Sequence, residues 1–182
     1  MEYRVDASAG SERFSGPAAS LGATVRPGGH AELRLAALVG RLSARTAGAL
    51  DRDLAQAMAE VSVPLGAWFV ARAGIAVRGF RTLAARQRWT TVQASGEARV
   101  PFLGRSVHGV LQLSYLPVVS VARLGRATSA FAAGAGLEYR LRPGEIRVVY
   151  SLERYAFAPP GAGRRPEQLS SLTVTLRPRV VQ

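Results

Sequence analysis

Apolar and polar residues alternate along most of this chain of 182 residues. Apolar side chains recur at every second position, and the residues between them are polar, charged or glycine. This period of two is typical of β-strands that have one apolar and one polar face. The alternation is clearest in segments 2–12, 18–26, 54–63, 68–79, 89–100, 131–141, 146–153 and 171–177. The pattern therefore predicts an all-β protein.

Two further segments alternate less regularly. Segment 107–120 has apolar residues on both faces and contains Pro117. Segment 31–43 is compatible with a helix as well as with a strand, because it is rich in leucine and alanine and its apolar residues also recur at helical spacing. The flanking strands and Gly40 in its middle favour a strand, which brings the expected number of strands to ten.

The links between the predicted strands are of two kinds that mostly alternate. Short, turn-like links rich in proline and glycine lie at 26–30, 64–66, 103–105 and 142–145. Longer or more polar links lie at 13–17, 44–53, 82–88, 122–128 and 158–167. This arrangement predicts successive antiparallel hairpins in a single domain over residues 1–182. Both chain ends are then expected on the side of the short turns.

Alternation alone does not tell whether the apolar face is a core or faces lipid. Six glycines on the polar face favour a closed barrel, because small residues leave room for long charged side chains in a lumen. They are Gly10, Gly22, Gly74, Gly96, Gly134 and Gly136. Charges of both signs are nearly balanced on this face, as expected for an enclosed network of ion pairs. We expect the lumen network to contain Arg4, Asp6, Glu60, Arg72, Arg78, Glu97, Arg99, Glu138, Arg140, Arg147, Glu153 and Arg177.

The composition adds a strong positive charge. The chain has 24 basic residues, all of them arginine, against 12 acidic ones, for a formal net charge of +12. Such an excess favours contact with polyanions, such as nucleic acid or phosphorylated lipid. The excess gathers in the longer links. We expect an outer rim for polyanion contact made of Arg45, Arg52, Arg81, Arg86, Arg88, Arg123, Arg126, Arg164 and Arg165.

Residues that carry catalysis or metal binding are scarce. The chain has no cysteine, and both histidines, His30 and His108, belong to the short-turn side. Asp51 and Asp53 flank Arg52 in a long link, so no nucleophile, base and acid come together. We therefore expect no enzyme activity, no metal site and no cofactor. The sequence also has no run of 18 apolar residues that predicts a membrane-spanning helix, and no signal-peptide pattern at its start.

This pattern resembles that of the small outer-membrane β-barrel proteins of Gram-negative bacteria. The resemblance rests on the even strand number, the short turns opposite longer loops, and the apolar belt with aromatic residues at some of its edges, such as Tyr3, Phe69, Phe131 and Tyr139. It implies a closed, antiparallel, up-and-down transmembrane barrel with a polar lumen. It also implies location in the bacterial outer membrane, a removed signal peptide, and contact with membrane lipid and lipopolysaccharide. The chain departs from the family by ending in Val180, Val181 and Gln182 instead of an aromatic residue.

Ten strands enclose little space, so we expect the Arg/Glu network to plug or narrow the lumen. The expected role is structural, a surface interaction or a narrow pore, with a possible protein partner at the loops or in a larger membrane assembly. The alternative is a soluble, basic all-β module that binds nucleic acid or another polyanion. Against it, aromatic residues make up only 7% of the chain and do not alternate with the arginines as stacking platforms would.

Overall fold

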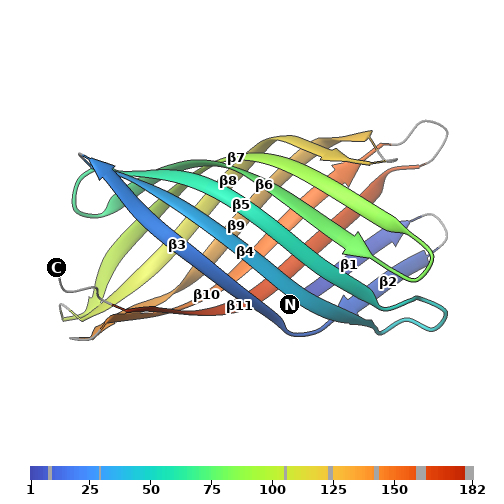
Figure 1. The fold of residues 1–182 in the computed structure, drawn as a ribbon, viewed down its shortest axis with the longest axis horizontal. Coiled ribbons are helices and arrows are strands. Elements are labelled where there is room, and N and C mark those ends of the chain that lie inside the picture. The colour runs from blue at the N-terminus through green and yellow to red at the C-terminus, as the bar shows by residue number, and fades with distance from the viewer. Residues whose placement is uncertain are drawn as a thin grey trace.

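The computed structural model describes residues 1–7, 10–28, 30–104, 106–122, 125–141, 144–158 and 163–178. Their antiparallel strands form one sheet that winds into a tube (Figure 1). The strands are β1 (Glu2–Ala7), β2 (Gly10–Ser15), β3 (Ala18–Gly28), β4 (Ala31–Ala44), β5 (Arg52–Pro64), β6 (Phe69–Arg81), β7 (Arg86–Leu103), β8 (Val107–Val121), β9 (Gly125–Leu141), β10 (Gly144–Phe157) and β11 (Arg165–Pro178). The all-β prediction is confirmed, and segment 31–43 is a strand. No helix among the described residues is long and apolar enough to cross a membrane.

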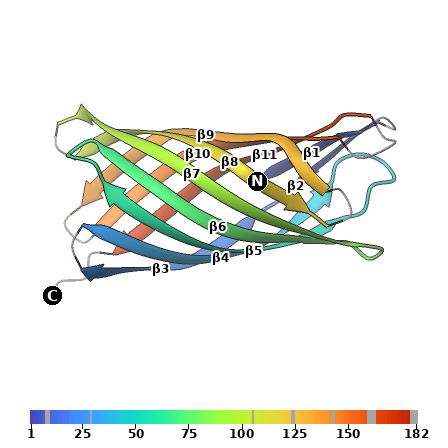
Figure 2. The ribbon, with the colours of Figure 1, turned by 90° about the horizontal axis from the view of Figure 1, so that it is seen from above.

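The sheet runs in the order β2-β1-β11-β10-β9-β8-β7-β6-β5-β4-β3, and β2 also pairs with β4. The β2–β4 contact, at Phe14↔Ala44 and Ser15↔Ser43, completes a ring of hydrogen-bonded strands. We call the end with the β4–β5 and β6–β7 links the loop end, and the end with the β5–β6 link the turn end. The loop end is on the right of Figure 1, and Figure 2 shows from above that the strands cross the tube obliquely.

The first strands differ from the prediction. Segment 2–12 is not one strand but parts of β1 and β2, which pair as a hairpin. The link expected at 13–17 is wrong, because β2 continues through Gly16 and Pro17 into β3 as one bent strand. Met1 and Gly16 exchange backbone hydrogen bonds of 3.0 Å, and the Pro17 carbonyl accepts one of 3.3 Å from Arg41. The described residues form eleven strands where ten were expected, because segment 2–12 is divided between β1 and β2; with β2 and β3 counted as one, ten strands surround the tube at the loop end. Met1 lies midway along the tube and not at the turn end, where it was expected (Figure 1).

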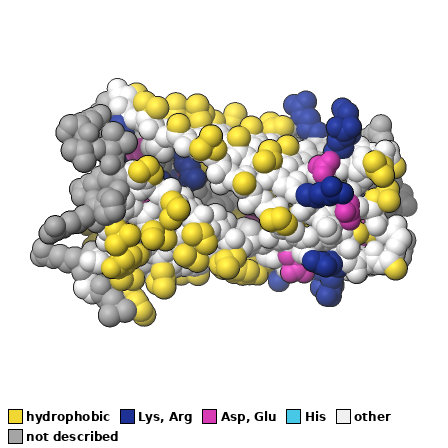
Figure 3. Space-filling view, turned by 60° about the horizontal axis from the view of Figure 1, so that its bottom comes forward, with side chains coloured by type: hydrophobic (Ala, Val, Ile, Leu, Met, Phe, Trp, Pro, Cys, Tyr) yellow, Lys and Arg dark blue, Asp and Glu magenta, His cyan; other side chains and the backbone are white. Residues whose placement is uncertain are grey.

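Apolar side chains cover much of the outside of the tube. Leu21, Leu113 and Leu176 are 84%, 71% and 72% exposed, and hydrophobic groups cover much of the face in Figure 3. Other outward apolar residues include Leu35, Val39, Val61, Ile75, Leu111, Phe131, Leu137, Val148, Leu172 and Val174. The inside has two parts. Charged side chains occupy it toward the turn end, and a cluster of aromatic and aliphatic side chains fills the loop half.

The irregular pattern of segment 107–120 has a structural reason. The register of β7 and β8 shifts where Gln93 on β7 faces both Leu116 and Pro117, so β8 has a β-bulge at this point. Before the bulge, β8 points leucines outward, and after it Val119 and Val121 are buried in the interior cluster. The strand therefore has apolar residues on both faces.

Candidate functional site: a filled lumen and an arginine rim

Glu97 on β7 is the centre of the charged part of the lumen. Its side chain is fully buried, and three guanidinium groups surround it. Arg72 Nη1 lies 2.7 Å and Arg99 Nε 2.6 Å from its carboxylate oxygens, and Arg147 Nη2 also donates to it. Gln112 Nε2 adds a fourth donor at 2.9 Å. Charge-assisted donors on several sides are what a buried carboxylate needs, because desolvation without partners is costly.

The network extends to both sides of Glu97. Arg72 Nε also lies 3.6 Å from Glu60 on β5, which accepts a hydrogen bond from Gln93. On the other side Arg99 Nε lies 3.8 Å from the buried Glu138 on β9, and Arg140 pairs with Glu138 at 3.0 Å. Alternating charges thus follow the inner wall from β5 to β9.

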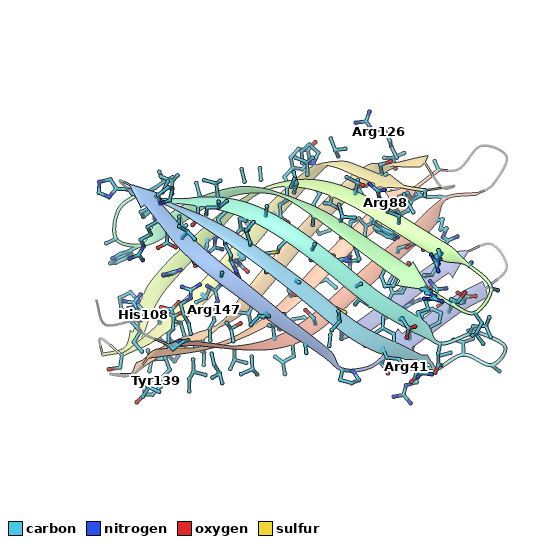
Figure 4. The ribbon with its side chains drawn as sticks, in the orientation of Figure 1. Arg41, Arg88, His108, Arg126, Tyr139 and Arg147 are labelled. Atoms are coloured by element: carbon cyan, nitrogen blue, oxygen red, sulfur yellow. The ribbon has the colours of Figure 1, made fainter. Side chains whose placement is uncertain are left out.

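Two ion pairs cross the lumen instead of following the wall. Arg78 on β6 binds Glu153 on β10 through both Nη atoms, at 2.8 and 3.1 Å, and neither strand neighbours the other in the sheet. Arg78 Nε also donates to Gln56 at 2.7 Å, and the Tyr155 hydroxyl donates to Glu153. The Arg147–Glu97 pair likewise joins β10 to β7, and Figure 4 shows Arg147 in the interior. These pairs brace opposite walls across the lumen.

Toward the loop end, beyond the charged part of the lumen, aromatic rings pack together inside the tube. Trp89 is 1% exposed and contacts four rings, those of Tyr155, Phe157, Phe80 and Tyr3, with centroids 4.9, 5.5, 6.0 and 6.5 Å away. Tyr3 stacks on Phe80 at 4.8 Å. We call this cluster of Tyr3, Phe14, Phe80, Trp89, Tyr155 and Phe157 the aromatic plug.

The alternation pattern does not predict the aromatic plug, and part of β1 has the face opposite to the predicted one inside. The pattern predicts Tyr3 at the edge of the outer belt and Arg4 and Asp6 in the lumen. Instead Tyr3 and Val5 are buried at 1% and 2%, while Arg4 and Asp6 point away from the interior and pair with each other at 2.9 Å. The reason is that the interior at this level is apolar, so the apolar residues of β1 turn inward. Strand parity could have found the plug, since Phe80 and Trp89 share a face with Arg78 and Thr91.

The other residues expected in the lumen network lie on the inner wall. Glu60, Arg72, Arg78, Glu97, Arg99, Glu138, Arg140, Arg147 and Glu153 are joined as described above. Arg177 lies apart from them at the turn end, where its Nη1 is 4.0 Å from Glu145. At the opposite end of the lumen, beside the plug, Glu167 is a buried acid that sequence analysis did not place in the network. It accepts a hydrogen bond from the Tyr3 hydroxyl and lies 2.8 Å from Arg165 Nε.

The arginines expected at the rim fall into two groups. Arg52 and Arg165 are mostly buried in the mouth of the tube, where Arg52 pairs with Glu12 at 2.8 Å and lies 4.0 Å above the Phe14 ring. They line a pocket of about 210 Å³ together with Arg86 and Phe80. The exposed group, which we call the arginine rim, comprises Arg45, Arg81, Arg86, Arg88, Arg126 and Arg164. Arg123 lies outside the described residues.

The charges of the arginine rim are not neutralised by ion pairs among the described residues. No salt bridge of the described residues involves any member of the rim, although Arg45 Nε donates to the Ser15 hydroxyl at 2.7 Å. Figure 4 shows Arg126 directed away from the tube at the loop end, and Arg88 is exposed next to the buried Trp89. Such groups are available to bind anions from outside.

The described residues contain no group of three or more His, Cys, Asp or Glu side chains arranged to hold a metal ion. His108 lies at the turn end, far from the arginine rim (Figure 4). No protein-family model matches this chain, and no curated protein sequence matches it significantly.

Proposed function

We propose that this protein is an integral β-barrel of the bacterial outer membrane, with a lumen closed to solutes and an arginine rim that binds the phosphates of lipopolysaccharide. The observation that carries the proposal is the inverted distribution of polarity. Leucines such as Leu21 and Leu176 are 84% and 72% exposed on the outside, whereas the side chains of Glu97 and Glu138 are fully buried inside. Proteins that fold in water bury leucine and expose glutamate, and a large exposed apolar surface calls for an apolar neighbour.

The height of the apolar belt supports this proposal. On β6 the outward apolar positions extend from Phe69 to Val77, about nine residues, and a transmembrane β-strand needs about 9–11. Charges begin where the belt ends. On β6 the first charged outward residue after the belt is Arg81, and register places it in one row with Arg41, Asp53 and Arg86. Arginines therefore follow directly after the belt, where lipid phosphates would meet the barrel.

Lipopolysaccharide is the polyanion that fits the arginine rim best. A guanidinium group offers a planar pair of donors that matches the oxygens of a phosphate. Arg88 and Arg126 are exposed beside the belt, so they could bind phosphate without moving the barrel wall. Binding of a soluble polyanion would need only the arginines, whereas binding of lipopolysaccharide also explains why they lie next to an apolar belt.

The contents of the lumen favour a structural or surface-binding role over a pore. The aromatic plug blocks the loop half, and the pairs Arg78–Glu153 and Arg147–Glu97 cross the charged half. Both barriers come from strands of the wall itself. Conduction would therefore require the plug and the ion pairs to part together.

Folding in a mild detergent tests the proposal directly. We expect the folded protein to stay folded in SDS until boiled and to migrate at a different apparent mass before and after heating. It should also bind lipopolysaccharide in a salt-sensitive way. A protein that is monodisperse in plain buffer, shows no heat-dependent shift and binds nucleic acid would instead be the soluble polyanion-binding module.

A further inference from the structure

In one part of the wall, two strand edges have no neighbouring strand to pair with among the described residues. β1 pairs with β11 only from Glu167 to Ser170, and on its other side the pairing ends at the hydrogen bonds between Met1 and Gly16. Toward the turn end, β3 pairs only with β4, and residues 171–178 of β11 pair only with β10. Within the described residues, two strand edges therefore face each other with no strand between them. We call the space between them the slot.

Backbone hydrogen-bonding groups on both edges point into the slot. The Pro17 carbonyl accepts from Arg41 on β4, and alternate residues of an antiparallel strand bond to opposite neighbours. Ala18, Ser20 and Gly22 therefore direct their backbone N–H and C=O groups away from β4. The same rule applies on the other edge. Met1 bonds to Gly16, so Glu2 directs its backbone groups to Ser170 on β11. The backbone N–H and C=O groups of Leu172, Val174 and Leu176 therefore also point away from β10. Such open edges readily pair with another strand.

The slot has the width of one strand. At the level of β1 the ring contains β1 between β2 and β11, and beyond Met1 the same ring continues without it. The edges are then two strand spacings apart, roughly 10 Å. Consistent with an open edge, every residue of β3 from Ala18 to Pro27 is exposed, including those of the inner face, whereas exposure alternates along β4. Figure 3 shows the surface hollowed between hydrophobic groups, with a basic side chain visible inside.

We propose that an extended segment joined to Met1 fills the slot as the upstream continuation of β1. The registers of β1 on its two sides carry this inference, because they agree. Continued beyond Glu2↔Ser15 and Glu2↔Ser170, both registers place the third residue before Met1 between Ala19 and Val174. A single strand can thus satisfy both edges at once. About seven such residues would reach the level of Pro178 at the turn end.

The neighbouring residues set the chemistry of the segment. Residues between Ala19 and Val174, and between Leu21 and Leu176, face outside and should be apolar. The residue between Ser20 and its partner on β11 faces the lumen and should be small and polar. The segment therefore repeats the alternation of the other strands, and it would turn the open tube into a closed wall of ten strands. The slot is a property of the sheet and is the same whether or not lipid surrounds the tube.

Disulfide cross-linking tests the slot well, because the chain has no cysteine of its own. We would join a nine-residue segment of alternating valine and serine to Met1, with a single cysteine as the third residue before Met1. Combined with Ala19→Cys, this cysteine forms a non-hydrogen-bonded cross-strand pair, whose Cα separation of about 4.5 Å suits a disulfide. We expect nearly complete cross-linking with Ala19→Cys and little with Ser20→Cys, which lies one residue away on the opposite face.

Two controls make the result decisive. Insertion of one glycine between segment and Met1 shifts the register by one residue and should move the cross-link from position 19 to position 20. Hydrogen exchange at the amides of Ser20 and Gly22 should slow at least tenfold when the segment is present. Equal cross-linking at positions 19 and 20, or unchanged exchange, overturns the proposal. Equal protection by the same segment added as an equimolar free peptide overturns its assignment as a continuation of β1.

Discussion

Leu113 on β8 and Leu83 in the β6–β7 link are both leucines on the outside of the molecule, with exposed fractions of 71% and 99%. Leu113 lies in the apolar belt, opposite Ala133 on β9 and Gly96 on β7. Gly96 was expected on the polar face, but it lies on the outer one, because the next residue, Glu97, is buried inside. Leu83 lies in the loop beyond the arginine rim. Arginine substitution at the two sites separates a lipid-facing belt from a water-exposed surface, since contacts within the protein change little at either one.

If the belt faces hydrocarbon, Leu113→Arg should destabilise the folded barrel by about 2–4 kcal/mol, the penalty for a lipid-facing arginine near the bilayer centre. That range lowers the folding equilibrium constant by roughly 30- to 700-fold. Leu83→Arg should change stability by less than about 0.5 kcal/mol, as do most surface substitutions. In plain water the two variants should behave alike.

Reversible unfolding in guanidinium chloride in the presence of phospholipid vesicles measures this difference. Trp89 is buried in the aromatic plug and Trp68 is exposed at the turn end, so fluorescence reports on loss of the plug. Equal unfolding midpoints for Leu113→Arg and Leu83→Arg in vesicles would refute the assignment of the belt to lipid. A large effect of Leu83→Arg would refute it as well.

Three further outcomes are expected. Glu97→Ala leaves three buried guanidinium groups without their shared partner and should destabilise the barrel by about 3–5 kcal/mol. The loss is measured as a lower denaturation midpoint, and a change below about 1 kcal/mol would contradict the ion-pair network. The wild-type protein should show no steady channel openings in planar bilayers. Trp89→Ala should lose about 3–5 kcal/mol of stability and show transient openings, whereas steady openings of the wild type would show that the plug does not block the lumen. Arg88→Gln combined with Arg126→Gln should weaken lipopolysaccharide binding by roughly tenfold at low salt and by less at high salt. A loss of affinity that is the same at all salt concentrations would exclude contacts between these arginines and phosphate.

Much of the barrel wall could be predicted from local sequence. Segment 68–79 alternates strictly, and β6 places Ile75 outside and Arg72 and Arg78 inside, as its pattern indicates. The strand at segment 31–43 could not be predicted from its own residues, because leucine and alanine favour a helix locally. Its strand partners on both sides decided the outcome.

The N-terminal region shows where local patterns fail. Alternation in β1 is equally clear with either face inward, so it does not tell whether Tyr3 or Arg4 enters the lumen. Tyr3 enters because Phe80, Trp89 and Phe14, from three other strands, form an apolar interior at that level. The continuation of β2 into β3 likewise depends on hydrogen bonds from Gly16 to Met1 and from Arg41 to Pro17.

The sequence by itself determined the strands and the two-faced character of the wall, because a pleated strand points successive side chains to opposite sides whatever surrounds it. Only the tertiary structure decided how the lumen is divided into a charged half and an aromatic half. It also decided which carboxylates meet which guanidinium groups, as in Arg78–Glu153 across the tube. Both depend on contacts between strands far apart in the chain, and the tilt and register that bring them to one level are properties of the closed sheet and of no single segment.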